Sequence, residues 1–143
     1  MLDDEPKLPL GAALIEAAEA WRAHLRADLA LMSDAGKLGA AADLLALVEP
    51  TGLSQTTLTE RAGLTKQAVQ QLLDRLEAAG LVRRDIDGRD KRVRRVVPTD
   101  AGLHAMAERL AVEHRLEKAA REKLGKKRYT QLKKALRKLG ETD

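Results

Sequence analysis

The stretch SQTTLTERAGLTKQAVQQLLDRLEAAGLVRR, residues 54–84, decides the fold of this 143-residue chain. Ser54 can cap a short helix that runs toward Ala62, and Gly63 can form the tight corner that follows. Thr65 can cap a second helix, and Gly80 stands where helices often end in the left-handed conformation. The apolar residues of the second helix recur at helical spacing and form one buried stripe: Val69, Leu72, Leu73 and Leu76. The stretch therefore predicts two short helices joined by a turn.

A basic hairpin follows the two helices. Residues 81–84 and 93–97 are strand candidates, the Asp87-Gly88 pair between them signals a turn, and Pro98 ends the second strand. Three aspartates stand among seven basic residues of the hairpin, which are Arg83, Arg84, Arg89, Lys91, Arg92, Arg94 and Arg95. Helix, turn, helix and basic ribbon in this order predict a winged helix-turn-helix, a shape that can place one helix in the major groove of DNA.

Helical patterns flank this region on both sides. Residues 1–9 are acidic and contain two prolines, so we expect a flexible leader. Apolar residues then recur at steps of three and four over 10–32, and a second helix is expected over 39–48. Thr99 can cap a long helix that runs to about residue 124, and after Gly125 a last helix is expected over 126–139. The expected fold is mainly α with a small β-wing.

Composition excludes several classes of protein. The chain has no Cys, which removes disulfides and thiolate metal sites, and no apolar run approaches the roughly 20 residues needed to cross a bilayer. We therefore expect a cytoplasmic protein. The net charge of +4 is unevenly distributed, since residues 1–60 hold 4 basic against 10 acidic residues, whereas residues 61–98 hold 10 against 5. This asymmetry favours an anionic partner for the basic part.

Neither a metal site nor an enzymatic site emerges from the sequence. His104 and Glu108 are one helical turn apart, but His114 points away from His104 by roughly 80° on the same helix. No Gly-rich phosphate loop, nucleophile elbow or pair of catalytic carboxylates is present. We expect no cofactor, no metal and no catalysis.

The second helix of the helix-turn-helix carries the residues that could read DNA. Gln67, Gln70 and Gln71 lie in or near its N-terminal half, which reaches base edges when such a helix enters a groove. A glutamine side chain can donate to and accept from adenine, and Lys66 can bind guanine or phosphate. The alternative is a polar face that merely keeps an amphipathic helix in contact with solvent.

The tip of the hairpin is the second candidate contact. Arg89, Lys91 and Arg92 lie there, and arginine can enter a minor groove, where the negative potential is strongest when the groove is narrow. The alternative is a charged edge strand that discourages aggregation.

Residues 54–102 resemble the MarR family of bacterial transcription regulators. The resemblance rests on Leu64-Thr65-Lys66, on the run from Leu72 to Glu77, on Gly80-Leu81-Val82, on Asp90-Lys91-Arg92 and on Thr99-Asp100-Ala101-Gly102. It implies that Asp90 orients arginine and that Arg92 reaches the minor groove. The family often has Ser or Thr where this chain has Gln67 and Gln70, and Arg where it has Gln71. The resulting candidate DNA-binding residues are Thr65, Lys66, Gln67, Gln70, Gln71, Arg75, Arg89, Asp90, Lys91, Arg92 and Arg94.

The resemblance also implies an assembly and a ligand. Family members are typically homodimers joined by their terminal helices. We therefore expect one domain over 10–143, with a dimerisation region at 10–48 and 99–143 around a DNA-binding region at 53–98. The expected partner is a pseudo-palindromic double-stranded operator, and the expected role is that of a repressor. Family members often bind small aromatic anions, for which Trp21, Arg22 and His24, with Tyr129, are the candidate ligand-binding residues. The alternative function is a winged-helix module that binds an acidic protein.

Overall fold

The computed structural model describes residues 7–141 of the chain and divides it into two compact units, Met1–Arg109 and Leu110–Asp143. The boundary falls inside the long helix α5 (Asp100–Leu124), so each unit holds part of that helix. Most of the expected leader, residues 1–6, lies outside the described residues. The expectation of one domain over 10–143 stays a prediction.

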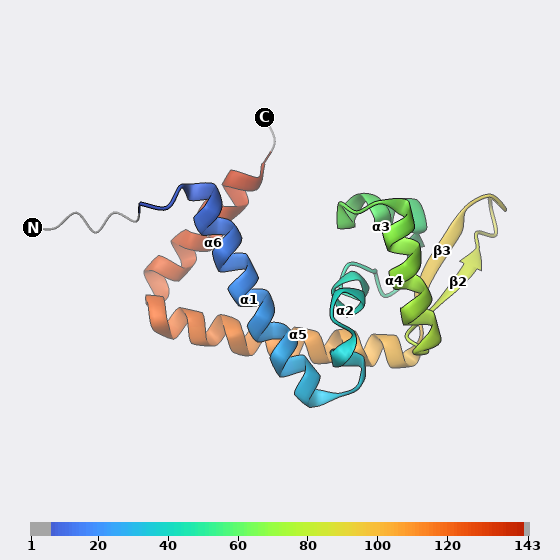
Figure 1. Cartoon of the computed structure of the whole chain (residues 1–143), viewed down its shortest axis with the longest axis horizontal. Helices are drawn as coiled ribbons and strands as arrows, with labels where there is room; N and C mark the ends of the chain where they lie inside the picture. Colours follow the sequence, from blue (N-terminus) through green and yellow to red (C-terminus); the bar gives the residue numbers. More distant parts are fainter. Residues whose placement is uncertain (1–6, 142–143) are drawn as a thin grey trace, which may run out of the picture. The chain divides into compact units, whose positions relative to one another are not determined.

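The first unit contains a winged helix-turn-helix, as expected from residues 54–98 (Figure 1). Helix α3 (Gln55–Ala62) and helix α4 (Lys66–Ala78) are joined at Gly63, whose φ of 64° is left-handed. Ser54 Oγ accepts a hydrogen bond from the Thr57 backbone N–H at 3.1 Å, and Thr65 Oγ1 accepts one from Ala68 at 3.1 Å. Both predicted caps are therefore confirmed, and they fix where each helix begins.

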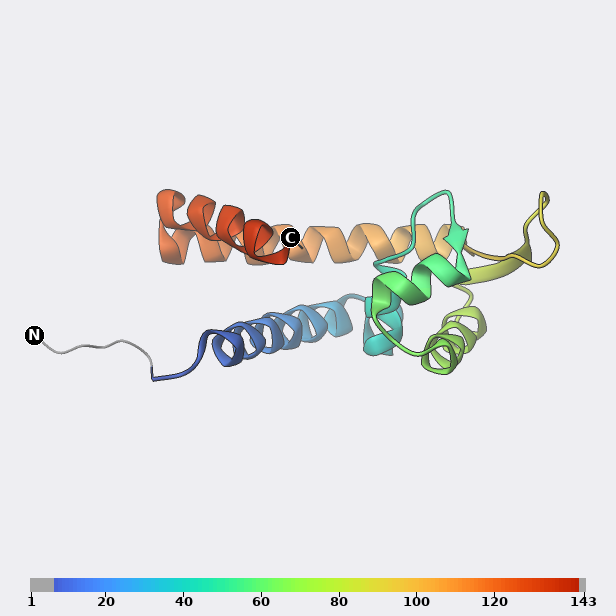
Figure 2. The ribbon, with the colours of Figure 1, turned by 90° about the horizontal axis from the view of Figure 1, so that it is seen from above.

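The sheet has three strands, of which the sequence indicated two. Strand β2 (Val82–Ile86) pairs with β3 (Arg94–Pro98), and β3 also pairs with the two-residue strand β1 (Leu53–Ser54), giving the antiparallel order β1-β3-β2. Both long strands are shifted toward the C-terminus of their predicted bounds, and Pro98 is the last residue of β3 rather than the residue after it. Figure 2 shows the β2–β3 hairpin, the wing, extending away from α3 and α4.

Two local predictions in the N-terminal helical region were too simple. The helix expected over 39–48 is α2 (Ala40–Leu45), which gives way to tighter turns where the N–H groups of Leu47 and Val48 each bond three residues back. The break predicted after residue 32 contains a short 3₁₀ helix, η1 (Ala35–Leu38). Helix α1 (Leu10–Met32) agrees with its prediction.

The core of the first unit lies beneath α4 and the sheet. Leu58 of α3, Val96 of β3 and the α4 residues Val69, Leu73 and Leu76 are fully buried. Leu72 lies at the edge of this core and is partly buried. The apolar stripe of α4 therefore faces inward, which leaves its polar face toward solvent.

An ionic cluster joins three helices of the first unit. Asp43 of α2 accepts hydrogen bonds from Arg26 of α1 and, at 3.0 Å, from Arg109 of α5. Nearby, Ser33 donates to Glu108 Oε2 at 2.9 Å. These contacts hold α1, α2 and the first turns of α5 together.

The second unit holds the rest of α5 and helix α6 (Lys126–Gly140), with Gly125 between them at a φ of 83°. Tyr129 is buried, and the cations of Arg121 and Lys133 lie 5.3 and 5.7 Å from the centroid of its ring. The remaining apolar residues predicted for one side of α6 are exposed: Leu132, Leu136 and Leu139.

Candidate nucleic-acid interface

The outer face of α4 is polar, and five of its side chains form no polar contact with the rest of the described chain. Its residues Lys66, Gln67, Gln70, Gln71 and Arg75 are exposed, and so is the capping residue Thr65. Among the described residues, none of the five side chains on α4 forms a hydrogen bond or an ion pair. They are therefore available to an external partner, and the positive end of the helix dipole lies beside the first of them.

The loop of the wing is shaped by two aspartates. Asp87 Oδ1 accepts a hydrogen bond from the Arg89 backbone N–H at 2.7 Å, and Asp90 Oδ1 accepts one from the Arg92 N–H at 3.0 Å. The hydrogen bond from the Arg89 N–H lowers the pKa of Asp87, so this carboxylate is charged at neutral pH. Across the loop, the Asp87 N–H bonds to the Val93 carbonyl at 2.8 Å. The aspartates therefore fix the turn from which the arginines project.

Asp90 also restrains the side chain of Arg92. Arg92 Nε lies 3.3 Å from Asp90 Oδ1, yet the Arg92 side chain remains 93% exposed. The guanidinium is thus oriented by a neighbouring carboxylate without being covered by it. The contact agrees with the expectation that Asp90 orients an arginine, and the expectation that Arg92 reaches the minor groove stays a prediction.

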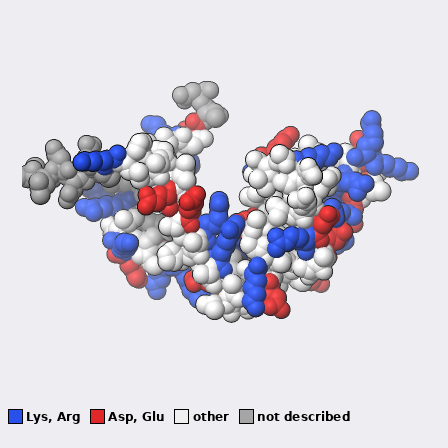
Figure 3. Space-filling view, in the orientation of Figure 1, with Lys and Arg blue, Asp and Glu red and all other residues white. Residues whose placement is uncertain are grey.

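The seven basic residues of the hairpin fall into two groups. Four have acidic partners, and these are Arg83 with Asp85, Arg84 with Asp74 and Glu77, Arg92 with Asp90, and Arg95 with Asp87. Within the described part of the chain, Arg89, Lys91 and Arg94 form no side-chain hydrogen bond or ion pair. Basic side chains project from the wing in the surface view (Figure 3).

Arg84 connects the wing to α4 instead of facing a partner. Its guanidinium lies 3.2 Å from Glu77 Oε1 and also bonds to Asp74, and only 20% of its side chain is exposed. The hydrogen bond from Arg84 lowers the pKa of Glu77, with an attractive charge interaction acting in the same direction. The sequence pattern alone grouped Arg84 with the other hairpin cations, because its partners lie seven and ten residues away.

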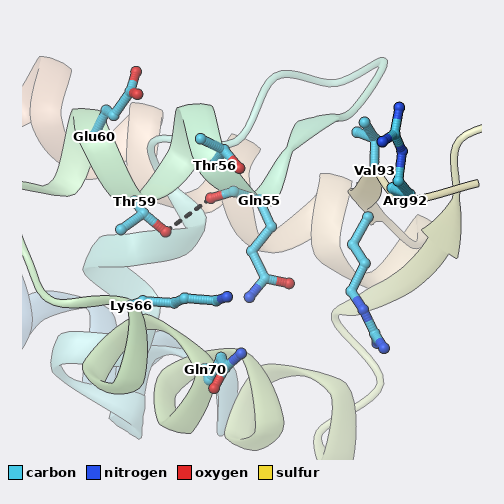
Figure 4. A pocket seen from close by; sticks show the side chains of 9 residues that line it. Gln55, Thr56, Thr59, Glu60, Lys66, Gln70, Arg92 and Val93 are labelled. Carbon is cyan, nitrogen blue, oxygen red and sulfur yellow. Dashed lines mark hydrogen bonds between the residues drawn. The ribbon is translucent and has the colours of Figure 1, made fainter. Parts of the chain in front are cut away.

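A pocket of about 340 Å³ lies between α3, the start of α4 and the wing (Figure 4). It brings together the predicted residues Lys66, Gln70, Arg92 and Arg94. It also includes residues of α3 that the sequence did not single out. The full lining is Gln55, Thr56, Thr59, Glu60, Lys66, Gln70, Arg92, Val93 and Arg94.

The three candidate ligand-binding residues of the first unit lie on α1, away from this pocket. Trp21 is partly buried, His24 is exposed, and Arg22 Nε lies 3.8 Å from Asp43 Oδ2 with 57% of the Arg22 side chain exposed. None of the three lines the pocket by the wing or a small cavity of about 20 Å³ between α1, α2 and α5. Tyr129 belongs to the second unit.

His104 Nε2 lies 2.8 Å from Glu108 Oε1, but over residues 7–141 no group of three or more side chains could hold a metal ion. In the same range, no helix has both the length and the apolar character that crossing a membrane requires.

Comparison with known proteins connects this geometry to a family. A family model described as the MarR family matches residues 38–93. The transcriptional regulator HosA of Escherichia coli is 40% identical over 62 residues, which cover 43% of this chain and 46% of HosA. The chain thus spans about half the length of the curated relatives it matches.

Solved structures agree with the chain over almost its full length. The transcriptional repressor CouR, bound to a 23-mer DNA duplex, has a TM-score of 0.78 at 24% identity and covers 99% of both chains. NadR in complex with 4-hydroxyphenylacetate has a TM-score of 0.71 at 26% identity and covers 100% of both chains. Together with the winged helix-turn-helix, these likenesses show that the chain has the fold of these regulators and that its α2–wing region, residues 38–93, matches the MarR family.

Proposed function

We propose that the protein is a homodimeric repressor that binds a pseudo-palindromic operator in double-stranded DNA. The observation that carries the proposal is the exposed polar face of α4 beside three wing cations, Arg89, Lys91 and Arg94, that have no ion-pair partner among residues 7–141. A protein that kept these groups only for solubility would not need them beside a helix-turn-helix. The DNA-bound structure of CouR, which has the same fold, supports this reading. This function would place the protein in the cytoplasm.

The three exposed glutamines give the proposed major-groove contact. Gln67, Gln70 and Gln71 carry both donors and acceptors, and the Asp90-oriented Arg92 can reach a minor groove at the same time. In a symmetric dimer the two α4 helices would meet successive major grooves, about 34 Å apart. The operator should therefore consist of two half-sites separated by about one helical turn.

The exposed apolar residues of α6 support dimerisation. Leu132, Leu136 and Leu139 are 45%, 45% and 57% exposed and recur at steps of three and four along one side of the helix. A stripe of this kind on a monomer is normally covered by a partner surface. The lysines and arginines of α6 would remain on the solvated outer face of the dimer, rather than lie against a membrane.

Selection of bound duplexes from a random pool tests the central proposal, because it reports binding and half-site spacing in one experiment. The affinity for the selected duplex should then fall about 10³-fold or more between about 50 and 200 mM salt if six or more phosphates are neutralised per dimer. Enrichment of no sequence, together with an affinity that does not depend on salt, would refute DNA binding. In that case a winged-helix module for an acidic protein partner would become the better account.

We further propose that a small aromatic anion releases the operator. Asp43 is approached by three guanidinium groups, those of Arg22, Arg26 and Arg109, so the cluster has an excess of positive charge. Arg22 is the most exposed of the three and is adjacent in sequence to Trp21. The complex of the relative NadR with 4-hydroxyphenylacetate supports a ligand of this class.

The fluorescence of Trp21, the single tryptophan, provides the test for this ligand. A saturable change on titration with aromatic carboxylates, which disappears in Arg22→Ala, would support the site. A change that is equal in both proteins would place the ligand elsewhere.

A further inference from the structure

The pocket beside the wing contains a buried polar group that the fold leaves unsatisfied. Gln55, the first residue of α3, is 8% exposed, and its Oε1 atom is buried without a hydrogen-bond partner among the described residues. Burial of an unpaired amide oxygen is unfavourable, and an apolar side chain of similar size would avoid it. The orphaned Oε1 is an acceptor and needs a donor, whereas the Nε2 end of the same amide can donate to a group in the pocket.

Two hydrogen-bond donors converge in this pocket. In Figure 4 the amide nitrogen of Gln55 and the ammonium of Lys66 point toward one another from α3 and α4. Neither group bonds to an acceptor within residues 7–141. Because both groups are donors, one acceptor placed between them would satisfy both together. A water molecule or an anion could supply that acceptor.

The charges around the pocket favour an anion. Lys66 and Arg94 line the pocket and have no ion-pair partner among the described residues, and Arg92 lines its opposite side. Glu60 is the one acid among the described lining residues, and Figure 4 shows its carboxylate directed away from Lys66. In addition, α3 and α4 both begin at the pocket, so the positive ends of two helix dipoles add to the attraction.

We propose that a phosphate of the DNA backbone occupies this pocket and that Gln55 is a phosphate-positioning residue. One phosphate oxygen accepts hydrogen bonds from Gln55 Nε2 and Lys66 Nζ, and Arg94 neutralises the charge. The pocket lies between α4, which reads the major groove, and the wing, which reaches the minor groove. The bound phosphate therefore belongs to the strand between these two grooves. The inference rests on the proposed DNA-binding function.

The decisive variant is Gln55→Leu, which keeps the side-chain size and removes both the donor and the unpaired oxygen. We expect its thermal midpoint to equal or exceed that of the wild type, while its affinity for duplex DNA at low salt falls about ten-fold. Because a phosphate contact carries no sequence information, random-sequence duplex should show the same loss as a selected operator. Glu60→Gln is the matched variant, and it should bind duplex several-fold more tightly, because it removes the one acid of the lining.

Neutral methylphosphonate linkages identify the phosphate. A single linkage placed at successive positions of a selected duplex should weaken wild-type binding about ten-fold at one position in each half-site. At that position the neutral linkage should not weaken binding by the Gln55→Leu protein any further, because the linkage and the substitution remove the same contact. Equal losses in the two proteins would show that the contact lies elsewhere and would overturn the proposal.

The remaining outcomes distinguish a failure of the proposed phosphate contact from a failure of the proposed DNA-binding function. Wild-type affinity in Gln55→Leu would overturn the phosphate contact and leave DNA binding intact, whereas joint loss of stability and affinity would show that Gln55 serves only packing. Another outcome is that inorganic phosphate competes with duplex binding more strongly than chloride does at equal ionic strength, while no methylphosphonate position weakens binding. That result would assign the pocket to free phosphate compounds and overturn the backbone contact. Absence of duplex binding by the wild-type protein would instead refute the proposed function.

Discussion

Replacement of Gly102 by alanine is expected to destabilise the winged unit, although Gly102 lies in a helix, where alanine is normally favoured. Gly102 is the third residue of α5, and a Cβ atom built there would lie 2.0 Å from the Leu81 carbonyl oxygen and 3.3 Å from Pro98 Cβ. Non-bonded carbon and oxygen atoms approach to about 3.3 Å. The start of α5 would therefore have to move by more than about 1 Å away from Leu81, which lies in the turn between α4 and β2.

The size of the effect follows from the hydrogen bonds at this junction. Thr99 donates its N–H to the Leu81 carbonyl at 3.0 Å, accepts from the Gly102 N–H at 3.1 Å through Oγ1, and donates that hydroxyl to the Gly80 carbonyl. Weakening two such bonds costs about 2 kcal/mol, and overpacking costs about 1–3 kcal/mol. The helix propensity of alanine offsets about 1 kcal/mol. We expect a net loss of about 2–4 kcal/mol, which corresponds to a fall in Tm of about 10 °C.

Thermal and urea unfolding followed by circular dichroism measure this loss, and Gly11→Ala is the matched control. Gly11 lies in α1, and a Cβ atom there would have no neighbour within 4 Å. Its replacement should leave stability unchanged or raise it by up to about 1 kcal/mol. A Gly102→Ala protein as stable as the wild type would show that the α5 start does not pack against Leu81 as described.

Three further predictions concern acid stability, the wing and the dimer. Because the pKa of Glu77 is lowered in the fold, its pairing with Arg84 stabilises the protein above the unfolded pKa of about 4.3. This stabilisation is lost as the pH falls through the lower folded pKa, so the free energy of unfolding measured with urea should fall between about pH 6 and pH 3. Arg84→Met should reduce that pH dependence. Arg92→Ala should weaken operator binding by about 1–3 kcal/mol in a mobility-shift titration, whereas Arg83→Ala, which removes a guanidinium paired with Asp85, should have a smaller effect; equal effects would remove the special role of Arg92. Leu136→Glu should shift sedimentation from dimer to monomer, and an unchanged dimer would exclude the α6 stripe from the interface.

The sequence predicted the elements whose signals are local. The helix caps Ser54 and Thr65 each bond to a backbone N–H three residues ahead, and Gly63 adopts the expected left-handed conformation. Such contacts depend on a few neighbouring residues and are little affected by the rest of the fold. The exposure of the three glutamines on α4 followed in the same way from the helical period of its apolar residues.

Features that depend on contacts between distant residues were missed. Strand β1 has two residues and exists because Leu53 pairs with Val96, more than 40 positions away. The burial of Gln55 was likewise missed, because it lines a pocket with residues of α4 and the wing, and glutamine at a helix start carries no local signal for burial. Arg84 looked like a surface cation because its acidic partners lie on another element.

The division of the wing cations into paired and unpaired groups changes the salt dependence expected for DNA binding. Counted from the sequence, two wings of a dimer would present 14 basic side chains, but 3 of the 7 in each wing are without an acidic partner among the described residues. Six neutralised phosphates give a slope of log affinity against log salt of about −5, and fourteen give about −13. A slope from the wings near the smaller value is therefore expected, because the acidic residues that fix the geometry of the wing also withdraw part of its charge. For Arg92 the two effects come from one group, because the Asp90 carboxylate that orients the guanidinium also offsets its positive charge.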